Sequence, residues 1–333
     1  MKKIKILAVG DMAAEPFIRI KTEEAETAFD HKENDWNLCF DYGSKIPYES
    51  AVLCYAVGNS PNVAITASRL GLKTSLVSYL GNDDIAKINI KKLKSENVLT
   101  RHIKKIKGLE SNFHYVLCYK KERTILVHHI NYPYQFNSKT EEPEWLYLSS
   151  LSENSFNYHK QIEQYLSAHP NVSLAIQPGT FQIRLGLEKM KSLYERTNLF
   201  CANKKEVEKM LSKQIDDIKS LLKEVYTLGP KLVIITDGIN GSYLYDGTDV
   251  LYMKAFYSEE KTIENTGAGD AFVGSFLSAK ILGKDNAESL VWASLNASSV
   301  VEQIGPHKGL LNKIELEKRY KDVNQNDYPK KIN

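Results

Sequence analysis

Short apolar runs alternate with longer amphipathic segments along most of this 333-residue chain, and no other feature restricts its fold as strongly. Strands are predicted for the apolar runs at residues 4–10, 74–81, 113–119, 123–129, 144–150, 172–178, 198–203, 232–238 and 242–247. Helices are predicted at residues 61–70, 83–96, 155–168, 181–195, 204–212, 215–226, 269–283 and 286–303. Because strands that alternate with helices form βαβ units, we predict an α/β fold with a central, mostly parallel sheet flanked by helices.

Two regions interrupt this alternation. Residues 16–57 are polar and aromatic without a helical pattern, and residues 113–129 resemble a hairpin. We interpret both as strands of a small β-sheet lid beside the main sheet. No internal repeat, low-complexity tract or linker divides the chain. The prediction is therefore a single domain, residues 1–333, with lid segments at about 12–57 and 111–130.

Composition and charge exclude several classes of protein. With 42% hydrophobic and 26% charged residues, the chain can bury a large core, and its net charge of +3 indicates neither a nucleic-acid nor a membrane partner. The N-terminal run "ILAVG" ends at Asp11, so it is shorter than an export signal, and no stretch has the length of a membrane span. The cysteines lack metal-type spacing, so we expect reduced thiols in a cytoplasmic protein.

The segment "ENTGAGDAFVGSFLSA", residues 264–279, is the strongest functional signal. Gly267, Ala268 and Gly269 leave backbone N–H groups open at the start of a predicted helix, where they attract an anion. Asp270 adds a carboxylate there, which in many helices is only a favourable contact with the helix dipole. The combination fits phosphoryl transfer, because the carboxylate can take a proton from a nucleophile while the amides stabilise the transferred group.

Two further segments follow predicted strands, and ligands in such sheets bind at the carboxyl ends of the strands. Asn203 and Glu206 in "ANKKEVEKM" have the spacing of a capping box, so a helix cap and a binding role both explain them. The turn "TDGINGS", which contains Thr236, Gly238 and Gly241, follows a strongly apolar strand and fits either a ligand site or an ordinary hairpin. The residues alone leave both alternatives open.

Together these motifs resemble the ribokinase-like, or PfkB, family of carbohydrate and nucleoside kinases. "ENTGAGDAF" is similar to the family's C-terminal signature, and "VGNSPNVAITASRLG", residues 57–71, resembles its N-terminal signature of paired glycines followed by Asn and Ala. Asn203 and Glu206 resemble its Asn-x-x-Glu motif, and "TDGINGS" resembles its Thr-x-Gly-x-x-Gly nucleotide turn. The motifs occur in the family's order and span most of residues 4–310.

The resemblance implies an ATP-dependent kinase that phosphorylates a hydroxyl of a small sugar or related carbohydrate. Asp270 would be the general base, and the amides of Gly267, Ala268 and Gly269 would form the anion hole. Glu206 would lie nearest the Mg²⁺ ion, and Asn296 would border the adenine. The residues on the side of ATP and Mg²⁺ would be Asn203, Glu206, Thr236, Gly238, Gly241 and Asn296. The acceptor would contact Asp11, Glu15, Gly58 and Asn62.

Three positions depart from the family's pattern. Val57 precedes Gly58 where the family has paired glycines, and Glu15 takes the place of an aspartate. Glu264 stands where many relatives carry an aspartate tied to a monovalent cation. The resemblance therefore leaves K⁺ activation and the sugar contact of Glu15 open.

The segment "HHINYPYQF", residues 128–136, concentrates side chains that could stack on a nucleobase or line a sugar cleft: His128, His129, Tyr132, Tyr134 and Phe136. An ordinary division between core and solvent also explains them, and we favour that interpretation.

Other functions remain compatible with an α/β chain. A dehydrogenase would need Gly-x-Gly-x-x-Gly after the first strand, and "AVGDMAAEP" offers only Gly10. A nucleoside kinase of the same fold, or a catalytically silent relative that binds nucleotide or sugar, stays as an alternative. Lid sheets often provide a dimer interface in relatives, so the resemblance also implies a homodimer through the lid.

Overall fold

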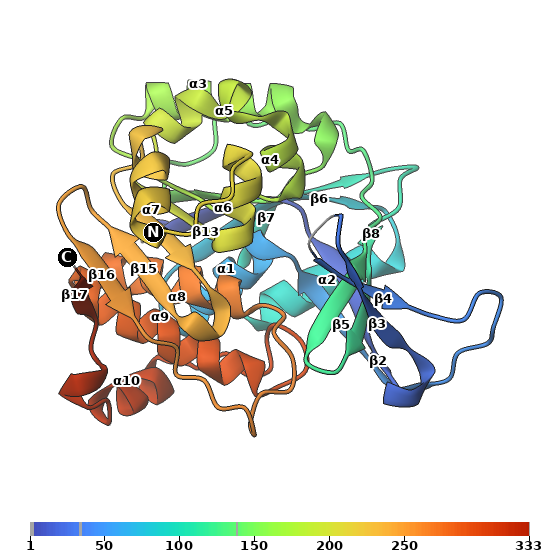
Figure 1. Cartoon of the computed structure of the whole chain (residues 1–333). Coiled ribbons are helices and arrows are strands. Elements are labelled where there is room, and N and C mark those ends of the chain that lie inside the picture. Colours follow the sequence, from blue (N-terminus) through green and yellow to red (C-terminus); the bar gives the residue numbers. More distant parts are fainter. Residues whose placement is uncertain (1–2, 33–34, 138, 333) are drawn as a thin grey trace.

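The computed structural model describes residues 3–32, 35–137 and 139–332 (Figure 1). The predicted domain of residues 1–333 thus includes positions outside the described residues: 1–2, 33–34, 138 and 333. The main sheet has the strand order β17 (Lys330–Ile332), β16 (Val250–Met253), β15 (Ser242–Tyr245), β14 (Val233–Thr236), β13 (Leu199–Asn203), β12 (Ser173–Ile176), β11 (Trp145–Leu148), β1 (Ile6–Val9), β6 (Thr74–Gly81) and β7 (Leu99–Ile106). Pairing is parallel from β14 to β7 and antiparallel from β14 to β17, which confirms the predicted mostly parallel sheet.

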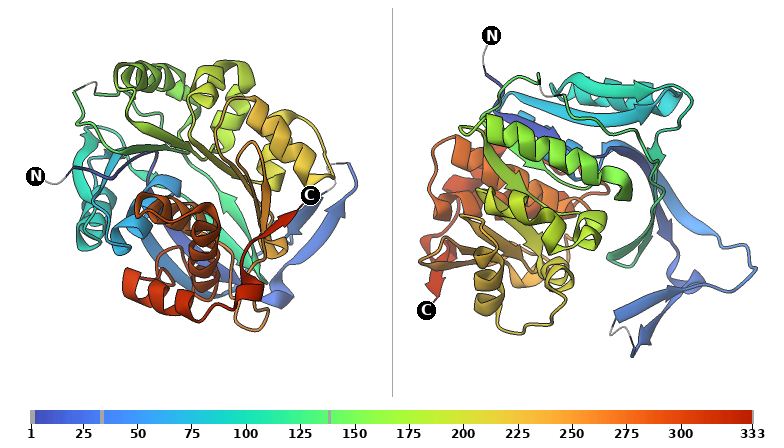
Figure 2. Two further views of the ribbon diagram at one scale, coloured as in Figure 1. Left: turned by 90° about the vertical axis from the view of Figure 1, so that its left-hand side faces the viewer. Right: turned by 90° about the horizontal axis from the view of Figure 1, so that it is seen from above.

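Helices cover both faces of this sheet (Figure 2). One layer contains α1 (Asn59–Arg69), α2 (Asp84–Ser95), α8 (Ala268–Ile281), α9 (Asn286–Val301) and α10 (Lys313–Lys321). The other contains α3 (Phe156–Ala168), α4 (Thr180–Leu185), α5 (Leu187–Glu195), α6 (Lys204–Leu211) and α7 (Ile218–Thr227). Successive strand side chains point to opposite faces, so Ile6 and Ala8 of β1 pack in the first core while Leu7 and Val9 pack in the second.

A smaller sheet, which we call the lid sheet, stands beside the main sheet. Its strand order is β10 (Glu122–Leu126), β9 (Tyr115–Tyr119), β2 (Ala13–Ile20) and β5 (Tyr48–Val57), and β8 (Asn112–Phe113) also pairs with β2. The hairpin of β3 (Glu26–Asp30) and β4 (Asp35–Cys39) projects away from the body (Figure 2). These strands arise from the two segments that interrupt the strand–helix alternation of the sequence.

The structure departs from the predicted elements at a few places. The helix predicted at 181–195 is divided into α4 and α5, because Gly186 between them has a φ of 84°. The sequence does not predict β7 or β17, the two edge strands, where charged residues break the apolar pattern. It also misses β16 and α10, the latter with Leu316 as its buried residue. Within the described ranges, no helix combines the length and apolar character needed to span a lipid bilayer.

Candidate active site

Asp270 lies in the first turn of α8, directly after a glycine turn. The helix begins after Gly267, whose φ of 82° lies in the left-handed region. A Cβ at Gly267 would lie 2.4 Å from the Cβ of Pro306, so the neighbouring loop also requires glycine here. Because the first N–H groups of a helix have no partners within it, the turn presents donors that suit an anion.

Three side-chain amides donate hydrogen bonds to the Asp270 carboxylate. Asn59 Nδ2 and Gln177 Nε2 lie 2.7 and 3.0 Å from Oδ1, and Asn62 Nδ2 lies 2.7 Å from Oδ2. Asp270 is only 7% exposed, and burial raises the pKa of its carboxyl group against the opposing effect of these bonds. The carboxylate is therefore held in one orientation beside the N–H groups of the turn.

Sequence reasoning did not select Asn59 or Gln177. Asn59 begins α1, and Gln177 follows the carboxyl end of β12. The Oε1 of Gln177 accepts a hydrogen bond from the Tyr147 hydroxyl at 2.8 Å, so its N–H group faces Asp270. The sequence did contain a signal for Gln177, because its side-chain amide comes directly after a buried strand, and ligands bind at the carboxyl ends of such strands.

The segments that start at Asn203 and Thr236 lie side by side, because these two residues are partners in the pairing of β13 with β14. Asn203 and Glu206 form a capping box, in which each backbone N lies 2.9 Å from a side-chain oxygen of the other. In the turn after β14, Gly241 has a φ of 97°, and a Cβ there would lie 2.2 Å from the Met253 carbonyl oxygen. The geometry of this turn therefore requires glycine.

A positive charge on the lid sheet influences the two carboxylates Asp270 and Glu206. Burial raises the pKa of Glu206 and the negative charge of Asp270 adds to this, whereas the Arg123 guanidinium lowers it. Arg123 also lowers the pKa of Asp270. Arg123 lies on β10, an exposed strand in which the sequence gives no signal for a site residue.

On the acceptor side, Asp11 and Glu15 are buried where the lid sheet joins the main sheet. The Tyr134 hydroxyl lies 2.8 and 2.7 Å from the two Asp11 carboxylate oxygens. Glu15 Oε1 lies 3.1 Å from His114 Nδ1. Gly58 has a φ of 122°, and a Cβ there would lie 2.8 Å from the Asp11 carbonyl oxygen, so the two backbone segments approach closely.

Two histidine rings accompany these carboxylates. The centroids of His114 and His129 are 4.9 Å apart, and His129 Nδ1 lies 3.4 Å from Asp11 Oδ2. Within the described part of the chain, His114 Nε2 and His129 Nδ1 are buried without a hydrogen-bond partner. His129 belongs to a segment that the sequence singles out, whereas His114 was missed.

Burial bears on two of the predictions made from sequence. Asn296 is fully buried, donates to Ser275 Oγ and accepts from the Leu311 N–H group, so it joins α9 to its neighbours. These bonds favour a structural role, and the contact of Asn296 with the adenine stays a prediction. Tyr132 and Phe136 are 0% and 6% exposed and belong to the core, as the favoured interpretation of that segment predicts.

The hairpin of the lid sheet contacts the loop that leads to the glycine turn. Lys121 Nζ donates to the Glu259 carbonyl oxygen at 2.8 Å, and Asn265 Nδ2 lies 3.3 Å from the Lys121 carbonyl oxygen. Asn265 precedes Gly267 by two residues. The lid and the glycine turn are thus connected through one loop.

Glu264 lies beneath the same loop and is 2% exposed. Its Oε2 accepts from the Thr266 N–H group at 2.7 Å, and its Oε1 accepts from the Gly305 N–H group at 2.9 Å. Both carboxylate oxygens are therefore bonded within the protein.

Comparisons with known proteins identify a family. Residues 25–313 match the family model described as pfkB family carbohydrate kinase. An uncharacterized sugar kinase of Archaeoglobus fulgidus is 24% identical over 257 residues, which cover 74% of this chain and 99% of that protein. A nucleoside kinase of Methanothermobacter thermautotrophicus is 28% identical over 291 residues, which cover 79% of this chain and 84% of that protein.

Solved structures share the fold. The nucleoside kinase of Methanocaldococcus jannaschii, an archaeal member of the ribokinase family, has a TM-score of 0.74 at 20% identity, with 97% of this chain and 100% of that chain covered. A putative ribokinase II of E. coli in complex with ATP and Mg²⁺ has a TM-score of 0.72 at 17% identity, with 96% and 100% covered. The ribokinase-like fold predicted from the sequence is thereby confirmed.

Proposed function

The chain belongs to the pfkB family of carbohydrate kinases, which are phosphotransferases acting on hydroxyl groups, and we propose that it transfers the γ-phosphate of ATP to a hydroxyl of a small sugar or related carbohydrate. The observation that carries this proposal is the buried Asp270 carboxylate, which three amides orient beside the glycine turn.

Asp270 is the general base of the proposed reaction. Its carboxylate removes the proton from the acceptor hydroxyl as that oxygen attacks the γ-phosphorus. The bond between this phosphorus and the β,γ-bridging oxygen breaks, and ADP leaves with the electron pair. The N–H groups of Gly267, Ala268 and Gly269 stabilise the negative charge on the transferred group.

The nucleotide lies against Asn203, Glu206, Thr236, Gly238 and Gly241 in this proposal, and their place at two adjacent strand ends supports it. In the described residues, no three His, Cys, Asp or Glu side chains are arranged to hold a metal unaided. The carboxylate of Glu206 is a hard oxygen donor that fits Mg²⁺, which keeps several waters and takes phosphate oxygens as ligands. When bound, Mg²⁺ would neutralise phosphate charge.

The acceptor site consists of Asp11, Glu15, Gly58 and Asn62, to which we add the two histidines. Native structures pair nearly all buried polar groups, so His114 Nε2, which has no hydrogen-bond partner among the described residues, calls for a ligand partner, whereas His129 Nδ1 already lies 3.4 Å from Asp11 Oδ2. Carboxylates only accept hydrogen bonds, and hydroxyl groups are the donors that match them. A neutral acceptor rich in hydroxyl groups fits this set.

A nucleoside kinase is the second candidate. The rings of His129 and Phe181 meet edge to face with centroids 5.4 Å apart, and His129 also neighbours Asp11, which supports an aromatic wall for a nucleobase. A catalytically silent relative is disfavoured, because such a protein has no need of an oriented Asp270.

We also propose that the lid segments at about 12–57 and 111–130 work as one lid on a single kinase domain. The lid strands expose large apolar side chains, among them Tyr48, Leu53, Tyr115 and Leu126, and this supports a homodimer through the lid. The cysteines are free thiols, which suits a cytoplasmic location.

The proposal is tested by measuring ATP consumption with magnesium over a panel of neutral sugars, sugar acids, sugar phosphates and nucleosides, with and without potassium. We expect turnover with a neutral sugar, and only a slight effect of potassium because both Glu264 oxygens are already bonded. A nucleoside as the only productive acceptor would favour the second candidate. ATP binding without turnover on any acceptor would identify a silent relative.

A further inference from the structure

The loop at residues 305–310, after α9, reaches the candidate active site at a point that no motif marks. Pro306 packs against Gly267 of the glycine turn. His307 Nε2 lies 2.8 Å from Asn62 Oδ1, and Asn62 Nδ2 lies 2.7 Å from Asp270 Oδ2. His307 is therefore separated from the proposed base by a single side chain.

The Asn62 amide has only one orientation that satisfies both neighbours. An ionised carboxylate only accepts hydrogen bonds, so the NH₂ group must face Asp270 and Oδ1 must face His307. Oδ1 is an acceptor, so His307 Nε2 carries a proton. Burial, with a contribution from the charge of Lys92, lowers the pKa of His307 to about 3, so the imidazole is neutral in ordinary buffers and carries one N–H group.

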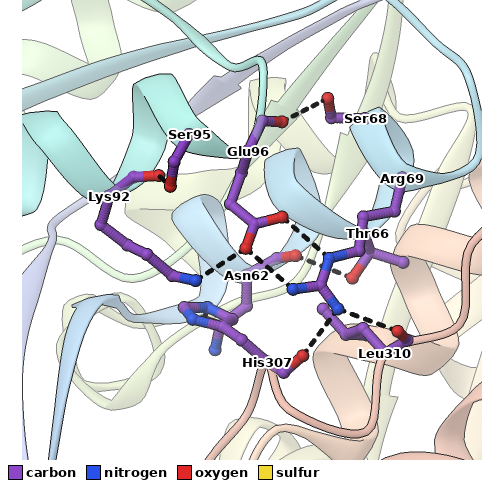
Figure 3. A network of polar contacts seen from close by, with 9 residues as sticks. All are labelled: Asn62, Thr66, Ser68, Arg69, Lys92, Ser95, Glu96, His307 and Leu310. Carbon is purple, nitrogen blue, oxygen red and sulfur yellow. Dashed lines mark hydrogen bonds and ion pairs between the residues drawn. The ribbon is translucent and has the colours of Figure 1, made fainter.

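An ion-pair cluster holds the backbone of the loop (Figure 3). Arg69 Nη1 donates to the carbonyl oxygens of His307 and Leu310 at 2.8 and 2.9 Å. Arg69 Nε and Nη2 each lie 2.8 Å from an oxygen of Glu96, and Lys92 Nζ adds a bond of 2.7 Å. The pKa of Glu96 falls to about 2 because these bonds and charges outweigh its burial. The cluster therefore stays ionised in ordinary buffers.

The helix α1 contacts the loop at both of its ends. Asn62 lies near its start and accepts from the His307 ring, whereas Arg69 lies at its end and binds the His307 carbonyl oxygen. The Asn62 backbone is fixed as well, since its carbonyl oxygen accepts from Thr66 Oγ1 at 2.8 Å. The His307 main chain and ring and the Asn62 backbone are thus all held by hydrogen bonds. The rotation that the His307 ring restricts is that of the Asn62 side-chain amide.

We propose that His307 is a positioning residue for phosphoryl transfer, and that its Nε2–H group holds the Asn62 amide in the orientation that donates to Asp270. This inference rests on the proposed role of Asp270 as the base. The terminal torsion of an asparagine is soft. Without His307, Asn62 Oδ1 loses its donor, and the amide can turn away from the carboxylate.

Replacing His307 changes none of the other charged and titratable groups around the two side chains in chemical identity. The groups that are linked electrostatically to Asp270 are Glu206 on α6, Arg123 on β10, Tyr147 on β11 and Cys201 on β13. Those that act on His307 are Arg69, Lys92 and Glu96. A change in pH profile on replacing His307 therefore reports the altered hydrogen bonding of Asp270.

The main test is His307→Ala, assayed by single-turnover phosphoryl transfer. Loss of orientation at a reacting group is expected to lower kcat by about ten- to a hundredfold, with KM for ATP and acceptor within a few-fold of the parent. A hydrogen bond to an ionised carboxylate lowers its pKa, so losing the Asn62 bond raises the pKa of Asp270. Since the base acts in its ionised form, the acidic limb of the kcat profile should move to higher pH.

Three companion variants separate positioning from general damage. His307→Gln keeps an N–H donor near the Nε2 position and should recover most of kcat. Lys308→Ala changes the exposed neighbour in the same loop and should behave as the parent. In an Asn62→Ala background, His307→Ala should cause little further loss, because the effect passes through Asn62. Additive losses would overturn the inference.

Different experimental results would overturn this inference and the proposed function. A parent protein that transfers no phosphate to any acceptor overturns the proposed function and the inference with it. An active parent whose His307→Ala variant keeps the parent kcat and pH profile, with only a lower Tm, overturns the inference alone. Should that variant fail to fold, nitrogen NMR shifts of the parent imidazole decide, because an Nδ1–H tautomer would exclude the proposed bond.

Discussion

The main sheet buries its strands on both faces, whereas the lid sheet leaves many of its side chains in solvent. All residues of β6 are buried, and all residues of β10 are exposed. The proposed base lies in the packed region, and Glu15, His114 and Arg123 reach the site from the lid or its borders. In the proposed reaction the geometry of transfer depends on core packing, whereas Glu15 and His114 of the acceptor site belong to a region with many exposed side chains. Such a region is expected to open at low free energy.

The two regions meet at the loop before the glycine turn. Lys121 and Asn265 link the lid hairpin to this loop, and Gly267 begins α8 two residues after Asn265. Movement of the lid would therefore change contacts next to the glycine turn. The comparison predicts that variants in the body alter kcat or stability, and that variants in the lid alter the KM of the acceptor.

The largest expected effect is that of Asp270→Asn in the body. Loss of a general base lowers the rate by about 10²–10⁴-fold. ATP affinity should be kept or increase, because the N–H groups of the turn remain and a negative charge near the γ-phosphate is removed. Single-turnover transfer and nucleotide affinity are measured on one preparation. Transfer within a few-fold of the parent would show that Asp270 only stabilises the helix terminus, where a charge contributes about 0.3–1 kcal/mol.

Next in size is the difference in stability between Tyr132→Ala and Tyr115→Ala. Tyr132 is fully buried in the core of the body, and Tyr115 is 47% exposed on the lid. Truncating a buried aromatic side chain lowers the free energy of unfolding by about 3–5 kcal/mol, whereas most surface changes stay within about 0.5 kcal/mol. Urea unfolding of both variants measures the contrast. Equal losses would show that the lid is packed as tightly as the body.

Much of the main sheet could be predicted from sequence, because parallel strands buried on both faces appear as short apolar runs between amphipathic helices. The run at 232–238, for example, contains β14, whose Val233, Ile234 and Ile235 are fully buried. The edge strands could not be predicted, since each has one neighbour and carries charged residues. β7, which reads LTRHIKKI, illustrates this.

Some residues of the candidate site could likewise be predicted from sequence, and others could not. Asp270 and Gly267 were found because a local motif carries both the turn and the carboxylate. Gln177, His114 and His307 were missed because each is placed by contacts with residues distant in sequence, which no local pattern reports. The contacts of Asn296 could not be predicted for the same reason. A polar side chain on a helix gives no indication of whether it faces a ligand or, as here, a buried serine.

A smaller effect is expected for Glu15→Gln at the border of the lid. Glu15 is 7% exposed and pairs with His114, and a hydrogen bond to a charged group contributes about 1.5–3 kcal/mol. The KM of the acceptor should therefore rise by about tenfold or more, while the KM of ATP stays at the parent value. Glu49→Gln, an exposed carboxylate on β5, serves as the control. Parallel changes in both KM values would contradict an acceptor contact.

The smallest effect is expected for Glu206→Gln, for which the chain contains its own control. Asn203 and Glu206 cap α6, and Asn312 and Glu315 form the same Asn-x-x-Glu capping box on α10. Glutamine also serves in a capping box, so neither Glu206→Gln nor Glu315→Gln should lower Tm appreciably. Burial raises the pKa of Glu206, which means that the folded protein disfavours the charged carboxylate. Removing this charge should therefore not lower the free energy of unfolding. If Glu206 helps to hold magnesium, its variant should lose about tenfold in kcat and require more Mg²⁺ for half-maximal rate, whereas Glu315→Gln should match the parent. A magnesium titration that is the same for both variants would show that Glu206 is a helix cap and nothing more.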